Sequence, residues 1–232
     1  MSELGFPRVH LRRADSTNQR ARELAAAGAP HGTLVTATEQ SAGRGRQGRT
    51  WTAPPGRAVL ASVVVRDPPH LLPLAAGVAV ASVAGDEALI KWPNDVLIGG
   101  RKVAGILVEG RPQEGWAVVG VGLNVAVRPG DFPPELRDVA GTLGLEPGEV
   151  EPTLEWLLDR LRCWLPAEPA DVLAAVRARD ALLDAPVRWS GGHGRGGGID
   201  GDGRLIVVTA EGRVTLEAGE VHLGSGAARE PS

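Results

Sequence analysis

The feature that most constrains the fold is a change in the texture of the sequence close to Pro186. Before this point, segments with helical spacing of apolar residues alternate with short β-rich runs such as 58–66 (AVLASVVVR). After it, short Val-rich runs are separated by turn-forming residues, Gly-Asp-Gly at 201–203 and Glu-Gly at 211–212. The pattern predicts an α/β core followed by a small β module, with the boundary within 183–186.

Composition limits the class of protein. A chain of 232 residues can form one large domain, or one large and one small domain. The net charge of −3 provides no overall positive field to recruit nucleic acid. The single cysteine, Cys163, excludes an internal disulfide and suits a reducing compartment. Residues 1–15 lack the apolar core of a signal peptide, and no apolar run reaches membrane-spanning length, so we expect a cytoplasmic chain without membrane segments.

Helices and strands can be assigned in outline. Ser16 is expected to cap a helix, with Gln19 completing a capping box and Gly28 ending the helix. Spacing predicts further helices over 71–86, 153–164 and 171–183. Residue type predicts strands over 32–39, 58–66, 88–92, 102–109 and 116–121, with a Gly-Gly turn at 99–100 and a flexible Gly-rich turn at 191–198.

The segment 43–49 (GRGRQGR), closed by Trp51, is the clearest candidate for a binding loop. Three arginines on a backbone loosened by three glycines can bend around an anionic ligand and bring both guanidinium and backbone N–H groups to it. Short Gly/Arg runs also bind single-stranded RNA or form plain surface loops. The loop alone therefore leaves these readings open.

Four further segments have both a structural and a functional interpretation. Residues 91–95 (KWPND) follow a strand, where a turn can place polar groups on a ligand or serve only as a turn. Lys102 opens an apolar strand and can reach into a pocket or shield the strand end. Segment 119–124 (VGVGLN) lacks the third glycine of a dinucleotide fingerprint, so we expect instead a tight strand end that offers the Asn124 amide. Residues 16–18 can cap a helix or hold a polar ligand.

Taken in order, these segments resemble biotin–protein ligases. The match runs through 16–18 (STN), 39–51 (EQSAGRGRQGRTW), 91–95 (KWPND), 102–109 (KVAGILVE) and 120–124 (GVGLN). The tail over 198–221 is similar to the small SH3-like C-terminal domain of that family. The resemblance implies an α+β fold, with a mixed-sheet, class II synthetase-like catalytic domain over 1–184 and an SH3-like β-barrel over 185–232.

The resemblance implies an enzyme that forms biotinyl-5′-AMP from biotin and MgATP and passes the biotinyl group to a lysine of a carboxylase biotin carrier domain. In the first step a carboxylate meets a phosphate, so fixed cations must offset their repulsion, and Lys102, Arg44, Arg46 and Mg²⁺ are expected to do so. Asp95 is a candidate helper for Mg²⁺ or for the incoming amine. The expected biotin-binding residues are Ser16, Thr17, Asn18, Gln40, Arg44, Gly45, Arg46 and Lys102. The expected nucleotide-binding residues are Arg49, Trp51, Lys91, Asn94, Asp95 and Asn124.

Two competing functions remain at this stage. A lipoate–protein ligase shares the catalytic fold, although GRGRQGRTW together with KWPND favours biotin. A nucleic-acid-binding module would use the Gly/Arg loop, but the chain has no Tyr and only two Phe for base stacking. Only about fifteen residues precede Ser16, too few for the winged helix-turn-helix of the family's repressor members, so no DNA binding is expected. A homodimer is compatible with the resemblance.

Overall fold

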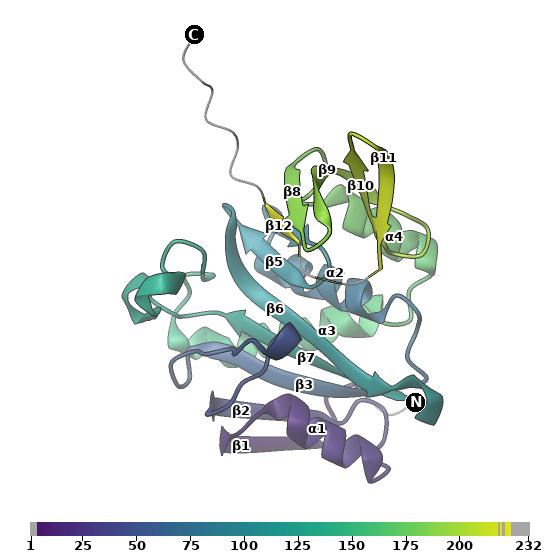
Figure 1. The fold of residues 1–232 in the computed structure, drawn as a ribbon. Helices are drawn as coiled ribbons and strands as arrows, with labels where there is room; N and C mark the ends of the chain where they lie inside the picture. The colour runs from purple at the N-terminus through teal and green to yellow at the C-terminus, as the bar shows by residue number, and fades with distance from the viewer. Residues whose placement is uncertain (1–3, 218, 220, 224–232) are drawn as a thin grey trace.

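The computed structural model describes residues 4–217, 219 and 221–223, which form two sheets (Figure 1). The larger sheet has the strand order β1-β2-β3-β7-β6-β5-β4. Its β1–β2 pair is parallel and its other pairs are antiparallel, so the sheet is mixed, as the predicted fold class requires. Its strands are β1 (Arg8–Ala14), β2 (Leu34–Gln40), β3 (Ala58–Arg66), β4 (Leu89–Lys91), β5 (Asp95–Ile98), β6 (Arg101–Arg111) and β7 (Trp116–Asn124).

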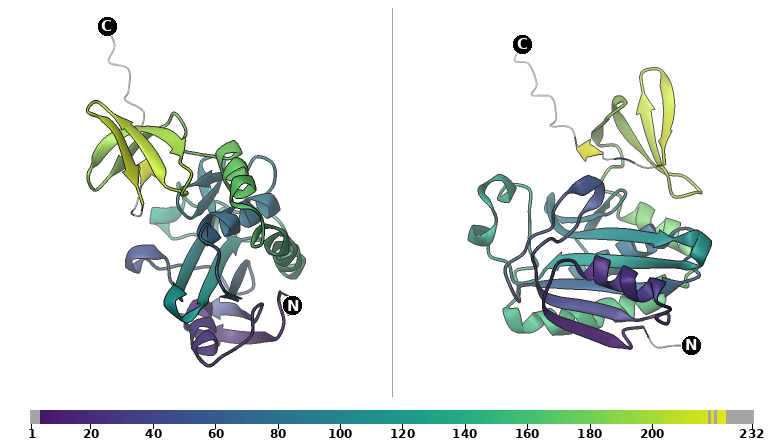
Figure 2. Two further views of the ribbon diagram at one scale, coloured as in Figure 1. Left: turned by 90° about the vertical axis from the view of Figure 1, so that its right-hand side faces the viewer. Right: turned by 60° about the horizontal axis from the view of Figure 1, so that its bottom comes forward.

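Helices cover both faces of this sheet (Figure 2). On one face, α1 (Thr17–Ala26) packs its buried alanines against Val64 and Val118. On the other face lie α2 (Leu72–Ala84) and α3 (Val150–Trp164), and α4 (Pro169–Ala178) packs on α2. The side-chain alternation along the strands explains this division, because successive residues of a strand point to opposite faces. The α1 face also carries the candidate site.

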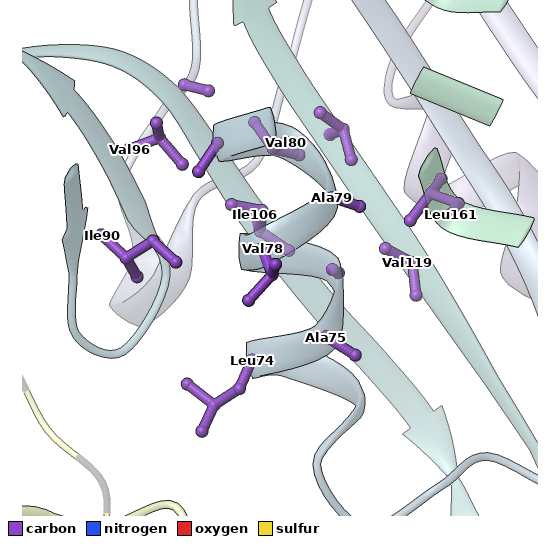
Figure 3. Close-up of a cluster of buried hydrophobic side chains, with 14 of the residues drawn as sticks. Leu74, Ala75, Val78, Ala79, Val80, Ile90, Val96, Ile106, Val119 and Leu161 are labelled. Carbon is purple, nitrogen blue, oxygen red and sulfur yellow. The ribbon is translucent and has the colours of Figure 1, made fainter. Parts of the chain in front are cut away.

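The core is built around α2 (Figure 3). This helix is apolar on almost all sides because it is enclosed by the sheet, α3 and α4, and it confirms the helix predicted within 71–86. Its residues Val78 and Ala79 meet Ile106 and Val119 from β6 and β7, and Leu161 from α3. Burying each large aliphatic side chain contributes about 1.5–3 kcal/mol, so this cluster holds β6 and β7 in a fixed position behind the site.

The smaller sheet is wholly antiparallel, with the order β11-β10-β9-β8-β12. The expected flexible turn at 191–198 is wrong, because most of it is the central strand β9. Its glycines are needed for close approach: a Cβ added at Gly196 would lie 1.8 Å from the carbonyl oxygen of Leu182. The strands are β8 (Pro186–Trp189), β9 (Gly192–Ile199), β10 (Leu205–Thr209), β11 (Gly212–Leu216) and β12 (His222–Leu223).

The two sheets share one core and a specific contact. Leu71 and Leu74, at the start of α2, belong to the same buried cluster as Leu205 of β10. The turn before β10 rests on them, because a Cβ added at Gly203 would lie 2.8 Å from each leucine side chain. The carbonyl of Gly203 accepts a 3.0 Å hydrogen bond from the indole Nε1 of buried Trp92. The smaller sheet is thereby attached to the turn that follows β4.

Local corrections concern the helix after α3 and the start of α1. The predicted helix over 171–183 ends at Ala178, because Asp180 and its neighbours leave the helix to pair with Ile90 of β4. Ser16 caps α1 as expected, but Gln19 turns to Glu23, and Asp15 accepts the Ser16 N–H that the capping box assigned to Gln19. Strands β1 and β5 had no counterpart in the sequence prediction. The predicted domain boundary at 184/185 falls just before β8. The last residues of the predicted C-terminal domain, 224–232, lie outside the described part of the chain.

Candidate active site

One cavity of about 550 Å³ on the α1 face brings the predicted site residues together. The register of the strands explains which sheet positions face the same side as this cavity. Ser62 on β3 is level with Gly120 on β7, and Gly120 with Leu107 on β6, so side chains of these positions point to the α1 side. The cavity is lined by all fourteen predicted residues: Ser16, Thr17, Asn18, Gln40, Arg44, Gly45, Arg46, Arg49, Trp51, Lys91, Asn94, Asp95, Lys102 and Asn124.

The polar wall of the cavity consists of Ser16, Thr17, Asn18 and Gln40. The Gln40 Oε1, at the end of β2, accepts the backbone N–H of Thr17 at 2.7 Å and lies 3.1 Å from Thr17 Oγ1. Ser62, fully buried on β3, places its Oγ 2.8 Å from Thr17 Oγ1 and 2.7 Å from Asn18 Oδ1. This wall is therefore tied to the sheet by side-chain hydrogen bonds as well as by packing.

Asn18 is the most constrained member of the polar wall. Its Nδ2 donates to the carbonyl of Leu107 at 3.2 Å and to Glu109 Oε2 at 2.9 Å. Arg22, one turn further along α1, forms an ion pair of 3.2 Å with the other oxygen of Glu109. A Cβ added at Gly120 would lie only 1.9 Å from Asn18 Oδ1, so the strand must carry glycine there. Asn18 thus makes its polar contacts chiefly with the protein.

Trp51 lies flat against two glycines of the sheet. Gly105 on β6 and Gly122 on β7 are direct partners across the ladder. A Cβ added at Gly122 would lie 2.4 Å from Trp51 Cε2, and one added at Gly105 would lie 3.1 Å from Cζ3. Lys102 Nζ is 5.7 Å from the centre of the ring, within cation–π range. The glycines of 119–124 accommodate side chains of this chain, an indole and an amide, where the sequence suggested a ligand.

The cationic wall consists of Arg44, Arg46, Arg49, Lys91 and Lys102. Among the described residues that line the cavity, Asp95 is the only carboxylate. Lys102 Nζ is 2.7 Å from Asp95 Oδ1, in an ion pair whose angles do not meet those of a directional hydrogen bond, and Lys91 Nζ is 3.8 Å from Oδ2. Five cations facing one carboxylate make this wall an attractive surface for anions.

Burial makes the positive charge of two of these cations more costly. It lowers the pKa of Lys91, against the opposing influence of Asp95, and the positive charges of Lys102 and Arg49 lower it further. Burial also lowers the pKa of Arg46, which the Asp95 carboxylate partly offsets. A bound anion would favour the charged form of Lys91 and offset the desolvation of the Arg46 guanidinium. The wall is therefore arranged so that a negative ligand relieves an existing electrostatic cost.

A bulge in the sheet gives Lys102 its direction. Between Val96 and Leu97 the pairing of β5 with β6 shifts register, so that Leu97 lies opposite Lys102. This shift brings the Lys102 side chain beside Gly105, whose added Cβ would lie 3.3 Å from Nζ. The backbone of Lys102 is also paired, its N–H donating to Val139 and its carbonyl accepting from Gly141.

The Gly/Arg loop closes on itself over β6 and β7. The N–H of Trp51 donates to the Gly43 carbonyl at 2.9 Å, and the N–H of Gly45 donates to the Arg49 carbonyl at 2.7 Å. At the tip, Arg46 Nη1 donates to Asn94 Oδ1 at 3.2 Å. Asn94 is itself fixed to β6, since its Nδ2 donates to the Ile106 carbonyl at 3.0 Å. The hydrogen bond from Arg46 to Asn94 therefore joins the loop to the KWPND turn.

Asn124 and Trp51 each have a buried polar atom without a partner in the described part of the chain. Asn124 uses its Nδ2 to donate to the Gly141 carbonyl at 2.9 Å, while its Oδ1 accepts nothing. The indole Nε1 of Trp51 likewise donates to nothing. A buried unpaired acceptor or donor costs about 1–3 kcal/mol, and both atoms belong to cavity-lining residues. They are suited to hydrogen bonds with a ligand.

Sequence reasoning missed an apolar rim and two supporting side chains. The rim comes from the segment after β7, and its Leu136 and Val139 are exposed beside the cavity. No motif marks these residues, because a lone Leu and Val in a loop carry no periodic signal. Ser62 was missed because it is a single polar residue in an apolar strand. Glu109 is the last residue of the motif over 102–109, but no role was predicted for it. The smaller sheet also reaches the cavity, through Val221, His222 and Leu223.

The structure offers little for a metal on its own. Among residues 4–217, 219 and 221–223, no three His, Cys, Asp or Glu side chains gather in a way that could hold an ion. Mg²⁺ commonly binds through one carboxylate together with nucleotide phosphates, and Asp95 fits that limited contribution. In the same described ranges, no helix is both long and apolar enough to cross a membrane.

An uncharged polar wall beside a cationic wall, on a mixed sheet, suits a site that holds a polar ligand next to an anionic one. The model of the biotin/lipoate A/B protein ligase family matches residues 10–125, and the model of the biotin protein ligase C-terminal domain matches 193–224. The chain therefore belongs to the biotin/lipoate A/B protein ligase family, and the predicted family and fold class are confirmed.

Its relatives are similar along most of their length. The chain is 37% identical to the biotin–[acetyl-CoA-carboxylase] ligase of Paracoccus denitrificans, over 92% of this chain and 99% of the relative. It is 35% identical to the bifunctional ligase/repressor BirA of Bacillus subtilis, over 90% of this chain and 71% of the relative. The structure resembles the biotin protein ligase of Aquifex aeolicus solved with biotin and ATP, with a TM-score of 0.81 and 26% identity, covering 94% and 99% of the two chains.

Proposed function

We propose that this chain is a biotin–protein ligase that activates biotin with ATP and transfers it to a lysine of a carboxylase carrier domain. The observation that carries the proposal is the juxtaposition, in one cavity, of the uncharged polar wall and the cationic wall. The sequence relatives named as biotin–[acetyl-CoA-carboxylase] ligases support the same substrate and acceptor. The Aquifex ligase, solved with biotin and ATP, supports the pair of small-molecule substrates.

In the first step, a biotin carboxylate oxygen attacks the α-phosphorus of ATP. The bond from this phosphorus to the bridging oxygen breaks, pyrophosphate leaves, and biotinyl-5′-AMP forms. Two anions must approach each other, and positioned cations lower that barrier most effectively where water is excluded. Lys102 is the best placed cation, because it is anchored on a strand and paired with Asp95. When bound, Mg²⁺ would neutralise the ATP phosphates, and Asp95 would be its protein contact.

In the second step, the neutral amine of the acceptor lysine attacks the acyl carbon of the intermediate. The carbon–oxygen bond to AMP breaks, an amide forms, and AMP leaves. Until then the mixed anhydride must be kept from water. Arg44, Gly45 and Arg46 can close over it, because the Gly/Arg loop lies above the cavity and Arg46 links its tip to the KWPND turn.

Each wall supplies the polar groups that one substrate requires. The polar wall would hold the ureido end of biotin, which needs both donors and acceptors. Trp51 would stack on adenine, and the unpaired Oδ1 of Asn124 would accept a hydrogen bond from the base. Lys91, Arg49 and Asn94 would face the phosphates and ribose. These assignments are proposals that rest on geometry and on the motif match.

The decisive experiment is biotin-dependent exchange of radioactive pyrophosphate into ATP with the purified chain. Exchange is expected with biotin and not with lipoate, because the two acids share a valerate-type carboxylate but differ in the ring. Transfer is then followed by labelling of a purified carrier domain and of the same domain with its acceptor lysine changed to arginine. Exchange that is stronger with lipoate, or absent with both acids, would overturn the proposal.

A further inference from the structure

The hydrogen bonds behind the polar wall run in one direction, which is set by the orientation of the Asn18 amide. Asn18 turns its Nδ2 toward two acceptors, the Leu107 carbonyl and the Glu109 carboxylate. The reverse orientation of the amide would bring Oδ1 against both of these oxygens. The ion pair with Arg22 holds the Glu109 carboxylate in this place. Asn18 Oδ1 must therefore face Ser62, and as a carbonyl oxygen it can only accept.

The hydroxyl protons follow from this orientation. Three oxygen–oxygen contacts join Asn18, Ser62, Thr17 and Gln40, at 2.7, 2.8 and 3.1 Å in that order. Only two hydroxyl protons, those of Ser62 and Thr17, are available for these three contacts. The Ser62 proton goes to Asn18 Oδ1, and the Thr17 proton goes to Ser62 Oγ, because these two contacts have the usual O–H···O length. The longest contact is left without a proton, and Gln40 Oε1 already accepts the Thr17 N–H at 2.7 Å.

The consequence concerns what the cavity offers to a ligand. With its proton directed into the protein, Thr17 presents only lone pairs to the cavity that it lines. A ligand ring with an N–H group can satisfy that acceptor, whereas a dithiolane ring has no N–H and would leave it buried and unpaired. A site built to pair a polar group discriminates strongly against an analogue that lacks the group.

We propose that Ser62 and Glu109 are positioning residues that fix the hydrogen-bond polarity of the polar wall, so that Thr17 selects a ligand carrying a cyclic N–H. The inference rests on the proposed function, since the ureido ring of biotin is such a ligand. Ser62 and Glu109 do not line the cavity, and act on the substrate only through Asn18 and Thr17.

The test compares equilibrium binding of biotin and of ATP by calorimetry to the full-length chain and its variants. Glu109→Ala and Ser62→Ala are each expected to weaken biotin binding about tenfold. The first removes the charge-assisted hydrogen bond that orients Asn18, and the second removes the hydroxyl that joins Asn18 to Thr17. ATP binding is expected to stay the same. Glu109→Gln should restore biotin binding to within about threefold of the wild type, because its amide oxygen still accepts from Asn18. Desthiobiotin, which keeps the ureido ring, should lose affinity for these two alanine variants by the same factor as biotin.

A matched control is Glu114→Ala, which removes a carboxylate paired with Arg111 in the turn of the same hairpin. It is expected to bind biotin as the wild type does. The inference is overturned if the Glu109→Ala variant binds biotin like the control, if biotin and ATP affinities fall together, or if Glu109→Gln fails to restore binding. If Ser62→Ala does not fold, the comparison of Glu109→Ala with Glu109→Gln decides the question. A wild-type chain that binds no biotin overturns the proposed function, and this inference falls with it.

Discussion

The two walls of the cavity differ in how far the protein satisfies its own polar groups. On the polar wall, Thr17, Asn18 and Gln40 are hydrogen-bonded to one another, to Ser62 or to β6. On the opposite side, the described residues leave Trp51 Nε1 and Asn124 Oδ1 unpaired and line the cavity with five cations and a single carboxylate, Asp95. Since an unpaired buried group or a crowd of like charges is costly, the second region has more to gain from a ligand.

This contrast assigns different tasks to the two regions. A wall whose groups are oriented by hydrogen bonds within the protein can recognise a neutral ring with little rearrangement, which favours selectivity. A cationic wall that is relieved by anions can contribute more to the transition state, where negative charges are brought together. Changes in the cationic wall should therefore affect rate, and changes in the polar wall should affect affinity and choice of substrate.

The largest effect is expected from Lys102→Ala. This change removes the strand-anchored cation of the cationic wall, and loss of one such stabilising group typically costs about 10²–10³ in rate. Pyrophosphate exchange at saturating biotin and ATP measures it, with the thermal unfolding midpoint as the check that the fold persists. Exchange at the wild-type rate would mean that the division of tasks between the walls is wrong.

A smaller effect is expected from Arg46→Gly, on retention of the intermediate more than on its synthesis. Arg46 reaches Asn94 across the top of the cavity, so its loss frees the tip of the loop. A charge-assisted hydrogen bond contributes about 1.5–3 kcal/mol, which corresponds to roughly ten- to a hundredfold faster escape of biotinyl-5′-AMP. The escaped anhydride would label lysines of unrelated proteins, as detected by biotin blotting. If bystanders are labelled no more than with wild type while adenylate still forms, Arg44 or Arg49 becomes the better candidate for the clamp.

Two glycines on one strand can separate the walls directly. A Cβ at Gly120 would collide with Asn18 of the polar wall, and a Cβ at Gly122 would collide with the Trp51 ring. Overpacking of this kind costs about 1–3 kcal/mol. Gly120→Ala should weaken biotin binding, and Gly122→Ala should weaken ATP binding, each by about tenfold or more in calorimetry. Gly148→Ala, where a Cβ meets nothing within 4 Å, is the matched control. Equal effects of both changes on both ligands would contradict the separation.

The smallest effect is expected in amide hydrogen exchange. The part of the loop over 44–50, before Trp51, is closed mainly by its own backbone hydrogen bonds, so opening it breaks few backbone bonds to the sheet. Its amides should exchange quickly and become protected when biotin and ATP are added together. The first turn of α1, tied to Gln40, should change little. Protection of the loop that ligands do not alter would count against closure over the intermediate.

Sequence alone identified which residues come together better than how they are arranged. The fourteen residues taken from the motifs line one cavity, because each motif ends or begins a strand of the same sheet, and their binding roles stay predictions. They could not predict the bulge that turns Lys102 toward Gly105, because a register shift depends on both paired strands. Strand β1 was missed because its arginines hide the strand pattern, and β9 because glycines that allow close packing also resemble a turn.

The hydrogen bond from Trp92 to Gly203 has a consequence for how the molecule comes apart. The indole is buried between the KWPND turn and the smaller sheet, and the leucines under Gly203 belong to the common core. Cutting the chain between 184 and 185 would expose this apolar contact and leave the indole N–H unpaired. Heat or urea should therefore melt both sheets in a single cooperative transition, and a fragment that ends at 184 should be less stable than the full chain.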